Sequence, residues 1–279
     1  MAGRARSRNK SKLLKIKLRG DNKVFTQFLY LSMNRVFVVD FAGNPIRYSF
    51  INKSTPKYFS RKIKLSEQSV YDIRMDRATF DLFRQVHSND FSDDYVEYKG
   101  LIYLTAKKLI EKKCCIFHSV SFIWREKVWL LTGDSGTGKT TQYLNWIHTF
   151  PNEITMISGD MPVLAFKNEN IMVHSSPWNG KERIGNQLSG RLGGIILLRQ
   201  GSDNTIQWAN IHEKIMTLFR QFAVIPENRV EIECLAEMTE QLIQKVPIWI
   251  FKNTGTIEST SILRNTLGDY LDKGVESDV

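Results

Sequence analysis

The chain has 279 residues, of which 42% are hydrophobic and 24% charged, a balance typical of a globular protein with a substantial core. Its three cysteines, two of them adjacent at Cys114 and Cys115, form neither a disulfide framework nor a spaced zinc site. No apolar run reaches the length of a membrane-spanning helix, and we expect a reducing, cytoplasmic setting.

The net charge of +10 is concentrated at the N-terminus. Residues 1–19 hold eight Lys or Arg and no acidic residue, which leaves 31 basic residues against 29 acidic ones in the remainder. Such a segment could contact nucleic acid or an acidic membrane, and its composition also resembles that of a transit peptide. We favour a solvated basic extension that runs into a first strand at 13–18, and we expect no nucleic-acid binding apart from contacts of this extension.

Residues 20–94 are expected to form a small mixed or β-rich N-terminal subdomain. Several of its stretches are rich in β-branched and aromatic residues, and turn-forming residues separate two of them. The expected elements are strands at 25–31, 36–41 and 46–51, a turn at 43–45, and a helix at 77–86.

Residues 95–272 are expected to form the larger domain, with a tail at 273–279. Strands and helices alternate here too irregularly for a doubly wound sheet, so the fold class that we predict is α/β of the mixed α+β kind, a mixed sheet flanked by helices. The expected strands lie at 115–123, 127–131, 154–158, 163–166, 171–174, 193–198 and 247–251, and the expected helices at 95–112, 139–149, 209–222, 227–244 and 259–271.

The stretch 128–141 carries the most specific pattern in the chain. An apolar run leads into Gly133, and after four further residues come Gly138, Lys139 and Thr140, which completes a phosphate-loop motif between a strand and a helix. Glycines at these positions allow successive backbone N–H groups to point at phosphate oxygens. The residues expected to contact a nucleotide are Gly133, Asp134, Ser135, Gly136, Thr137, Gly138, Lys139, Thr140 and Thr141.

Two residues of this motif have chemistry of their own. The Lys139 ammonium can reach the β- and γ-phosphates, and the Thr140 hydroxyl can be a ligand of Mg²⁺. The positive end of the helix that follows points at the same anion. The motif therefore predicts ATP and Mg²⁺ as ligands, whereas a glycine-rich turn without the Lys-Thr pair would not; it does not indicate what happens to the phosphate.

Three further side chains are candidates for the chemistry. Asp160 follows an apolar strand about twenty residues after Lys139, where a carboxylate that binds metal or accepts a proton is expected. Lys181, in the sequence Ser-Pro-Trp-Asn-Gly-Lys, is either a second cation for the γ-phosphate or a solvated loop residue. His118 precedes the strand of the loop, where a lone histidine is more often a buried structural residue.

Taken together, these motifs resemble those of the HPr kinase/phosphorylase C-terminal-domain superfamily, and most of all the HPr-kinase-like proteins found beside bacterial peptide-modification genes. The loop is also similar to that of ATP-dependent phosphoenolpyruvate carboxykinase. The resemblance covers 95–271. The matching segments are His118-Ser119-Val120, 133–141, 158–163 and 176–181.

The resemblance implies a P-loop kinase core of the HPr kinase/phosphoenolpyruvate carboxykinase type. In relatives, the residue matching His118 lies near the transferred phosphate, and Asp160 matches the first of two paired aspartates, implying a general base or a partner of Mg²⁺. The second position is Met161, which cannot bind a metal as a carboxylate does. Asn186 would lie near the substrate-facing loop, and relatives suggest a homo-oligomer.

We therefore predict an enzyme, a phosphotransferase that moves the γ-phosphate of ATP to an alcohol group. The acceptor would be a Ser or Thr hydroxyl of a peptide or small protein, or a small-molecule alcohol. Met161 keeps a second hypothesis open, a nucleotide-binding pseudokinase that is a partner in a peptide-modification complex. An ATPase switch ranks last, because no guanine-reading motif and no water-orienting residue is evident.

Overall fold

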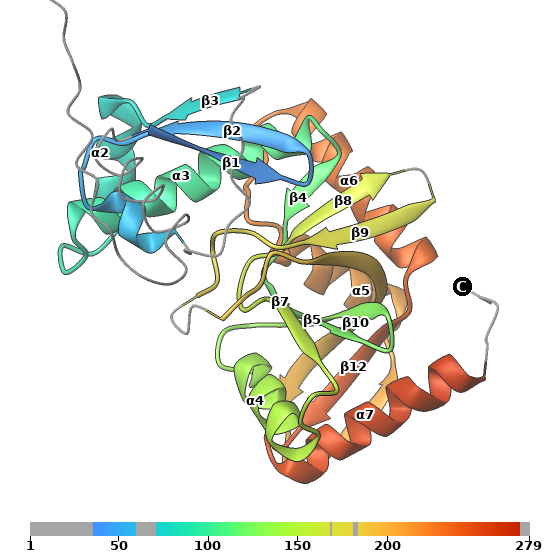
Figure 1. The fold of residues 1–279 in the computed structure, drawn as a ribbon. Coiled ribbons are helices and arrows are strands. Elements are labelled where there is room, and N and C mark those ends of the chain that lie inside the picture. The colour runs from blue at the N-terminus through green and yellow to red at the C-terminus, as the bar shows by residue number, and fades with distance from the viewer. Residues whose placement is uncertain (1–35, 60–70, 168, 181–183, 274–279) are drawn as a thin grey trace, which may run out of the picture.

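The computed structural model describes residues 36–59, 71–167, 169–180 and 184–273 (Figure 1). The basic extension, the expected strands at 13–18 and 25–31, the last residues of the tail and Lys181 lie outside these ranges. Over the described ranges, none of the helices combines the length and the apolar character that crossing a membrane requires.

A small three-stranded sheet, in the order β1-β2-β3, lies at the N-terminal side (Figure 1). Strands β1 (Val36–Phe41) and β2 (Asn44–Ser49) form an antiparallel hairpin, and β3 (Tyr71–Arg74) runs parallel to β2. Ala42 and Gly43, both at positive φ, make the two-residue turn, because left-handed residues match the twist of paired strands. The turn expected at 43–45 therefore begins one residue earlier and ends at Gly43, and Asn44 and Pro45 belong to β2.

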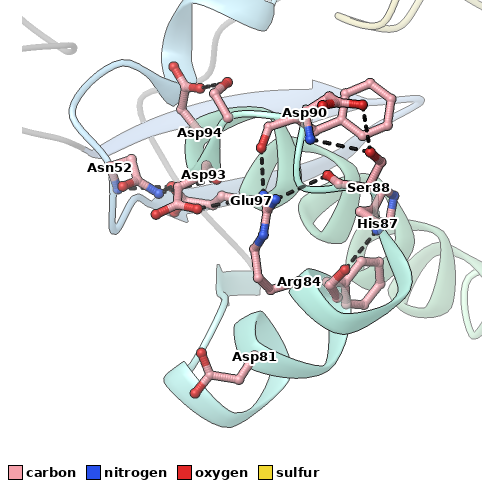
Figure 2. Close-up of polar contacts among 12 residues, drawn as sticks. Asn52, Asp81, Arg84, His87, Ser88, Asp90, Asp93, Asp94 and Glu97 are labelled. Carbon is pink, nitrogen blue, oxygen red and sulfur yellow. Dashed lines mark hydrogen bonds and ion pairs between the residues drawn. The ribbon is translucent and has the colours of Figure 1, made fainter.

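Two helices accompany this sheet, α2 (Arg77–Val86) and α3 (Asp93–Ile110). Asp76 caps α2 by accepting a hydrogen bond from the Thr79 N–H at 2.7 Å. Arg84 of α2 holds the loop that leads to α3, because its guanidinium donates to the backbone oxygens of Phe91 and Ser88 (Figure 2).

Glu97 of α3 anchors the segment that follows β2. Its carboxylate is fully buried and accepts from the backbone N–H groups of Ile51 and Asn52 at 2.5 and 2.9 Å. It also accepts from the Asn52 side-chain amide at 2.9 Å and from the Thr55 hydroxyl at 2.6 Å, and Figure 2 shows Asn52 beside Glu97. One buried charge thus satisfies four donors and fixes the short 3₁₀ turn η1 (Thr55–Tyr58) against α3.

The second sheet is larger and strongly curled. It has nine strands and contains both parallel and antiparallel pairs. The strands are β4 (Cys114–Ile116), β5 (Ser119–Trp124), β6 (Lys127–Thr132), β7 (Thr155–Ser158), β8 (Val163–Lys167), β9 (Asn170–His174), β10 (Ser189–Gln200), β11 (Thr205–Trp208) and β12 (Ile248–Asn253).

Strand β10 joins the two parts of this sheet. Its first residues, Ser189 to Arg191, pair with β9, and the later residues pair with β6 on one side and β12 on the other. The register shifts between Leu192 and Gly194, where the strand bends. A side chain at Gly194 would lie 2.7 Å from the rings of Trp129 and Trp249, so the bend packs closely only with glycine there.

Helices cover both faces of the sheet and create two cores. On one face, α4 (Lys139–Thr149) and α7 (Ile257–Asp272) pack over Phe122, Leu131 and Phe251. On the other face, a larger core joins α3, α5 (Ile211–Leu218) and α6 (Arg229–Lys245) to the small sheet. The structure is therefore a mixed α+β fold with a curled sheet and a small N-terminal sheet (Figure 1).

Strand direction determines where the connecting loops lie. Strands β6, β10 and β12 are mutually parallel, and β7 has the same direction as β6 because both are antiparallel to β5. Their carboxyl ends therefore meet at one edge of the sheet. The loops that follow these strands, at 133–138, 159–162, 201–204 and 254–256, are the place where a site is expected.

We expect Glu97→Ala to lower the free energy of unfolding by about 3 kcal/mol, because four donors would lose a charged acceptor and the buried Thr55 hydroxyl would find no water. Urea denaturation measures this loss. The matched control is Glu111→Ala, which removes an exposed carboxylate just beyond the last turn of the same helix. A similar effect of both substitutions would contradict the anchoring role.

Candidate functional site

The glycine loop, residues 133–138, lies between β6 and α4. Gly133, Gly136 and Gly138 adopt φ values of 140°, 83° and 93°, which residues with a side chain rarely adopt. A Cβ on Gly133 would also lie 2.6 Å from the backbone oxygen of Leu198 in β10. The sequence therefore folds into a strand, a tight left-handed loop and a helix that begins immediately at Lys139.

The start of α4 has no capping side chain and no acidic residue in its first turn. Three later helices differ: Asn210 with Glu213 caps α5, Asn228 with Glu231 caps α6, and α7 begins with Thr256 and Glu258. The first backbone N–H groups of a helix have no partner within it, and they carry partial positive charge. A bound anion is the partner that this arrangement suits.

Lys139 lies over the same loop. Its ammonium donates to the backbone oxygens of Gly133 and Asp134 at 2.9 and 3.0 Å. Burial lowers the pKa of Lys139 below its ordinary value, and the carboxylates of Asp160 and Asp134 oppose this shift. The ammonium is thus held by weak neutral acceptors beside an uncapped helix start, and it is available to a stronger anion.

Buried polar side chains connect α4 to β12 and α7. Gln142, one turn into α4, donates to Asn253 Oδ1 at 3.1 Å and to the Ser259 hydroxyl at 2.6 Å, and accepts from Thr260 at 2.8 Å. All four side chains are buried. On the outer side, Gln200 donates to the backbone oxygen of Gly136 at 2.8 Å. The loop is therefore fixed by β10, β12 and α7.

His118 and Asp160 come together on the other side of the loop. His118 Nε2 lies 3.2 Å from Asp160 Oδ1, and the two side chains are 35% and 28% exposed. Their backbones are tied by the Ser119 N–H, which donates to the oxygen of Asp160 at 2.8 Å. The structure thus brings His118 and Asp160 together, and the charge of the Asp160 carboxylate acts to raise the pKa of Lys139.

The segment 176–180 contacts the loop that carries Asp160. Trp178 is fully buried, and its backbone oxygen accepts from the Met161 N–H at 3.2 Å. Its ring packs against Phe41 and Phe59 at centroid distances of 5.2 and 6.1 Å. Phe41, at the end of β1, and Phe59, after η1, thus contact the loop that carries Asp160 through Trp178. Lys181, at the end of the matching motif, lies outside the described residues.

Asn186 has a structural contact rather than an open position. Its side-chain amide donates to the backbone oxygen of Met156 at 3.0 Å, and its N–H donates to Ile157 at 3.1 Å. It therefore supports β7, the strand that leads to Asp160. Nothing in these contacts bears on the substrate-facing position that the resemblance implies.

The remaining predicted residues follow the loop. Thr137 donates to the backbone oxygen of Asp134 at 2.9 Å, Ser135 and Thr141 are exposed, and Thr140 is half-buried. In the described part of the chain no three His, Cys, Asp or Glu side chains cluster as a metal site. The predicted oxygen donors of Thr140 and Asp160 still suit Mg²⁺, which takes one or two protein oxygens and completes its shell with phosphates and water.

No family model matches the chain, and no curated protein matches it either. Among solved structures, the chain is similar to the HPr(Ser) kinase/phosphatase from Coxiella burnetii, with a TM-score of 0.31 and 11% sequence identity over 54% of this chain and 95% of that one. A TM-score of this size carries no weight for the site.

The buried Gln142 was not predicted, although an amide within the apolar face of an expected helix is a signal for such a contact. We expect Gln142→Leu to lower the free energy of unfolding by about 2 kcal/mol, because Asn253, Ser259 and Thr260 would lose a buried partner. Chemical denaturation measures the effect. Gln241→Leu, on the exposed face of α6, is the control, and equal stability of both variants would contradict the interpretation.

Proposed function

We propose that the chain is a Mg²⁺-dependent kinase that transfers the γ-phosphate of ATP to a hydroxyl group. One observation carries the proposal. An uncapped, acid-free helix start with its lysine lies beside a His–Asp pair, at the edge where the parallel strands end. The first feature suits a polyphosphate, and the second suits a proton transfer next to it.

The glycine loop binds the phosphates in this proposal. The N–H groups from Gly133 to Thr141 surround the β-phosphate, and Lys139 exchanges its two carbonyl acceptors for phosphate oxygens. Charged acceptors make hydrogen bonds about twice as strong as neutral ones, so this exchange is favourable. Thr140 and Asp160 would hold Mg²⁺, which neutralises charge on the β- and γ-phosphates when it is bound.

Asp160 is the proposed general base. His118 Nε2 lies 3.2 Å from one carboxylate oxygen and would orient the group, so that the other oxygen accepts the proton of the acceptor hydroxyl. The acceptor oxygen then bonds to the γ-phosphorus, the bond between this phosphorus and the bridging oxygen breaks, and ADP leaves. Lys181, as a second cation, and His118 are the further groups proposed to stabilise the transferring phosphoryl group.

The same proposal assigns 95–272 to catalysis and 20–94 to an N-terminal subdomain, in a cytoplasmic protein. The acceptor is a Ser or Thr hydroxyl of a peptide or small protein, or a small alcohol. The second candidate function is a nucleotide-binding pseudokinase in a peptide-modification complex. It is favoured by Met161, whose side chain packs against the larger core and places no second carboxylate next to Asp160.

We expect Asp160→Asn to abolish phosphoryl transfer and to leave ATP binding within about threefold, because the amide keeps the shape of the side chain but accepts no proton. The measurement follows labelled γ-phosphate with Mg²⁺ and a panel of serine peptides and small alcohols. Undiminished transfer by the variant would remove Asp160 from its role. If the unmodified protein binds ATP without any turnover, the pseudokinase is supported; release of inorganic phosphate alone supports an ATPase.

Triphosphate binding is expected to weaken at alkaline pH. Burial holds the pKa of Lys139 below its ordinary value of 10.5, and a bound triphosphate raises this pKa again. At a pH between the pKa of the free protein and that of the complex, binding therefore takes up a proton. Affinity therefore falls as the pH rises through the pKa of the free protein. Calorimetry in two buffers of different ionisation enthalpy detects this uptake, and Lys139→Arg, which stays protonated, should eliminate it. An uptake that persists in this variant would exclude Lys139 as its source.

A further inference from the structure

Two loops lie at the same edge of the sheet as the glycine loop, on the side away from Asp160. We propose that these loops, 201–204 after β10 and 254–256 after β12, form the nucleoside subsite of the ATP site, with Asn204 and Thr254 in contact with the base or ribose. This inference rests on the proposed function and adds to it the residues that would distinguish a nucleotide from a bare polyphosphate.

The two loops are continuous with the glycine loop. Gln200, the last residue of β10, donates to the backbone oxygen of Gly136 at 2.8 Å, and the next residue, Gly201, donates to the oxygen of Asn253 at 3.1 Å. A Cβ on Gly255 would lie 3.9 Å from the Thr141 methyl group on the exposed side of α4. A ligand that leaves the glycine loop along α4 therefore meets these loops next.

The order of the strands gives the direction of the ligand. Asp160 follows β7, which lies beyond β5 on one side of β6, whereas β10 and β12 lie on the other side. The γ-phosphate must face Asp160 and His118 for transfer to occur. The nucleoside is at the opposite end of the polyphosphate, so it extends over the ends of β10 and β12, where Thr141 is exposed.

The chemistry of the loops fits a nucleoside. Asn204 Oδ1 accepts from the N–H and from the hydroxyl of Thr254 at 2.9 and 3.1 Å, which assigns the oxygen of the amide to this contact. The NH₂ group of Asn204 has no acceptor among the described residues, and its side chain is half-buried. A neutral donor next to a hydroxyl suits the ring nitrogens of a base or the oxygens of a ribose.

The test compares ATP with inorganic tripolyphosphate, which carries the phosphates without a nucleoside. We expect Asn204→Asp to weaken ATP binding, relative to tripolyphosphate binding, by about tenfold, because it removes one donor but keeps an oxygen for Thr254. The added negative charge acts on both ligands, so the ratio of the ATP affinity to the tripolyphosphate affinity reports the loss of the amide donor. Thr254→Ala should also lower the affinity for ATP relative to that for tripolyphosphate. The control, Gln207→Ala on the exposed side of β11, should leave this relative affinity unchanged.

The outcomes separate this inference from the proposed function. A lower ratio in the Asn204 and Thr254 variants supports the subsite. Equal losses for both ligands, or an unchanged ratio, would overturn it while the phosphate site remains. If the unmodified protein binds neither ATP nor tripolyphosphate, the proposed function itself fails and the subsite with it. Comparison of ATP with deoxy-ATP and GTP then shows whether the ribose or the base makes the contact.

Discussion

The rest of the site depends on the unneutralised positive end of α4. The chain gives its later helices capping amides, hydroxyls and glutamates, but leaves this one with free N–H groups and a half-buried lysine. Such a start costs stability, and the buried contacts of Gln142 with Asn253, Ser259 and Thr260 hold it in place. Because the loop is already fixed, less conformational entropy is lost when an anion binds.

The direction of the strands then distributes the chemistry around this helix. With β6 in the middle, the β7 side presents Asp160 and His118, and the β10 and β12 side presents Asn204 and Thr254. The ionisable pair and the neutral polar groups are thus separated by the glycine loop itself. Trp178 packs against Phe41 and Phe59, and its backbone oxygen accepts a hydrogen bond from the Met161 N–H. These contacts connect the loop that carries Asp160 to the N-terminal residues.

Much of the fold could be predicted because local patterns and tertiary structure agree. The helix expected at 77–86 is α2, and the hairpin expected at 163–166 and 171–174 is β8 with β9. Strands β3 and β11 were missed, because four residues carry little periodicity and these strands are defined by pairing with β2 and β12. The candidate residues could be named from motifs, whereas the contact of His118 with Asp160 depends on the pairing of β5 with β7, which no local pattern contains.

The single strand β10 has a further consequence. Its start is hydrogen-bonded to β9 in one part of the sheet, and its end lies between β6 and β12 in the other, so the two cores share one backbone. Loss of order in either half releases one end of the strand with which the other half pairs. We therefore expect the larger sheet and its helices to unfold cooperatively, with partial opening beginning at the edge strands.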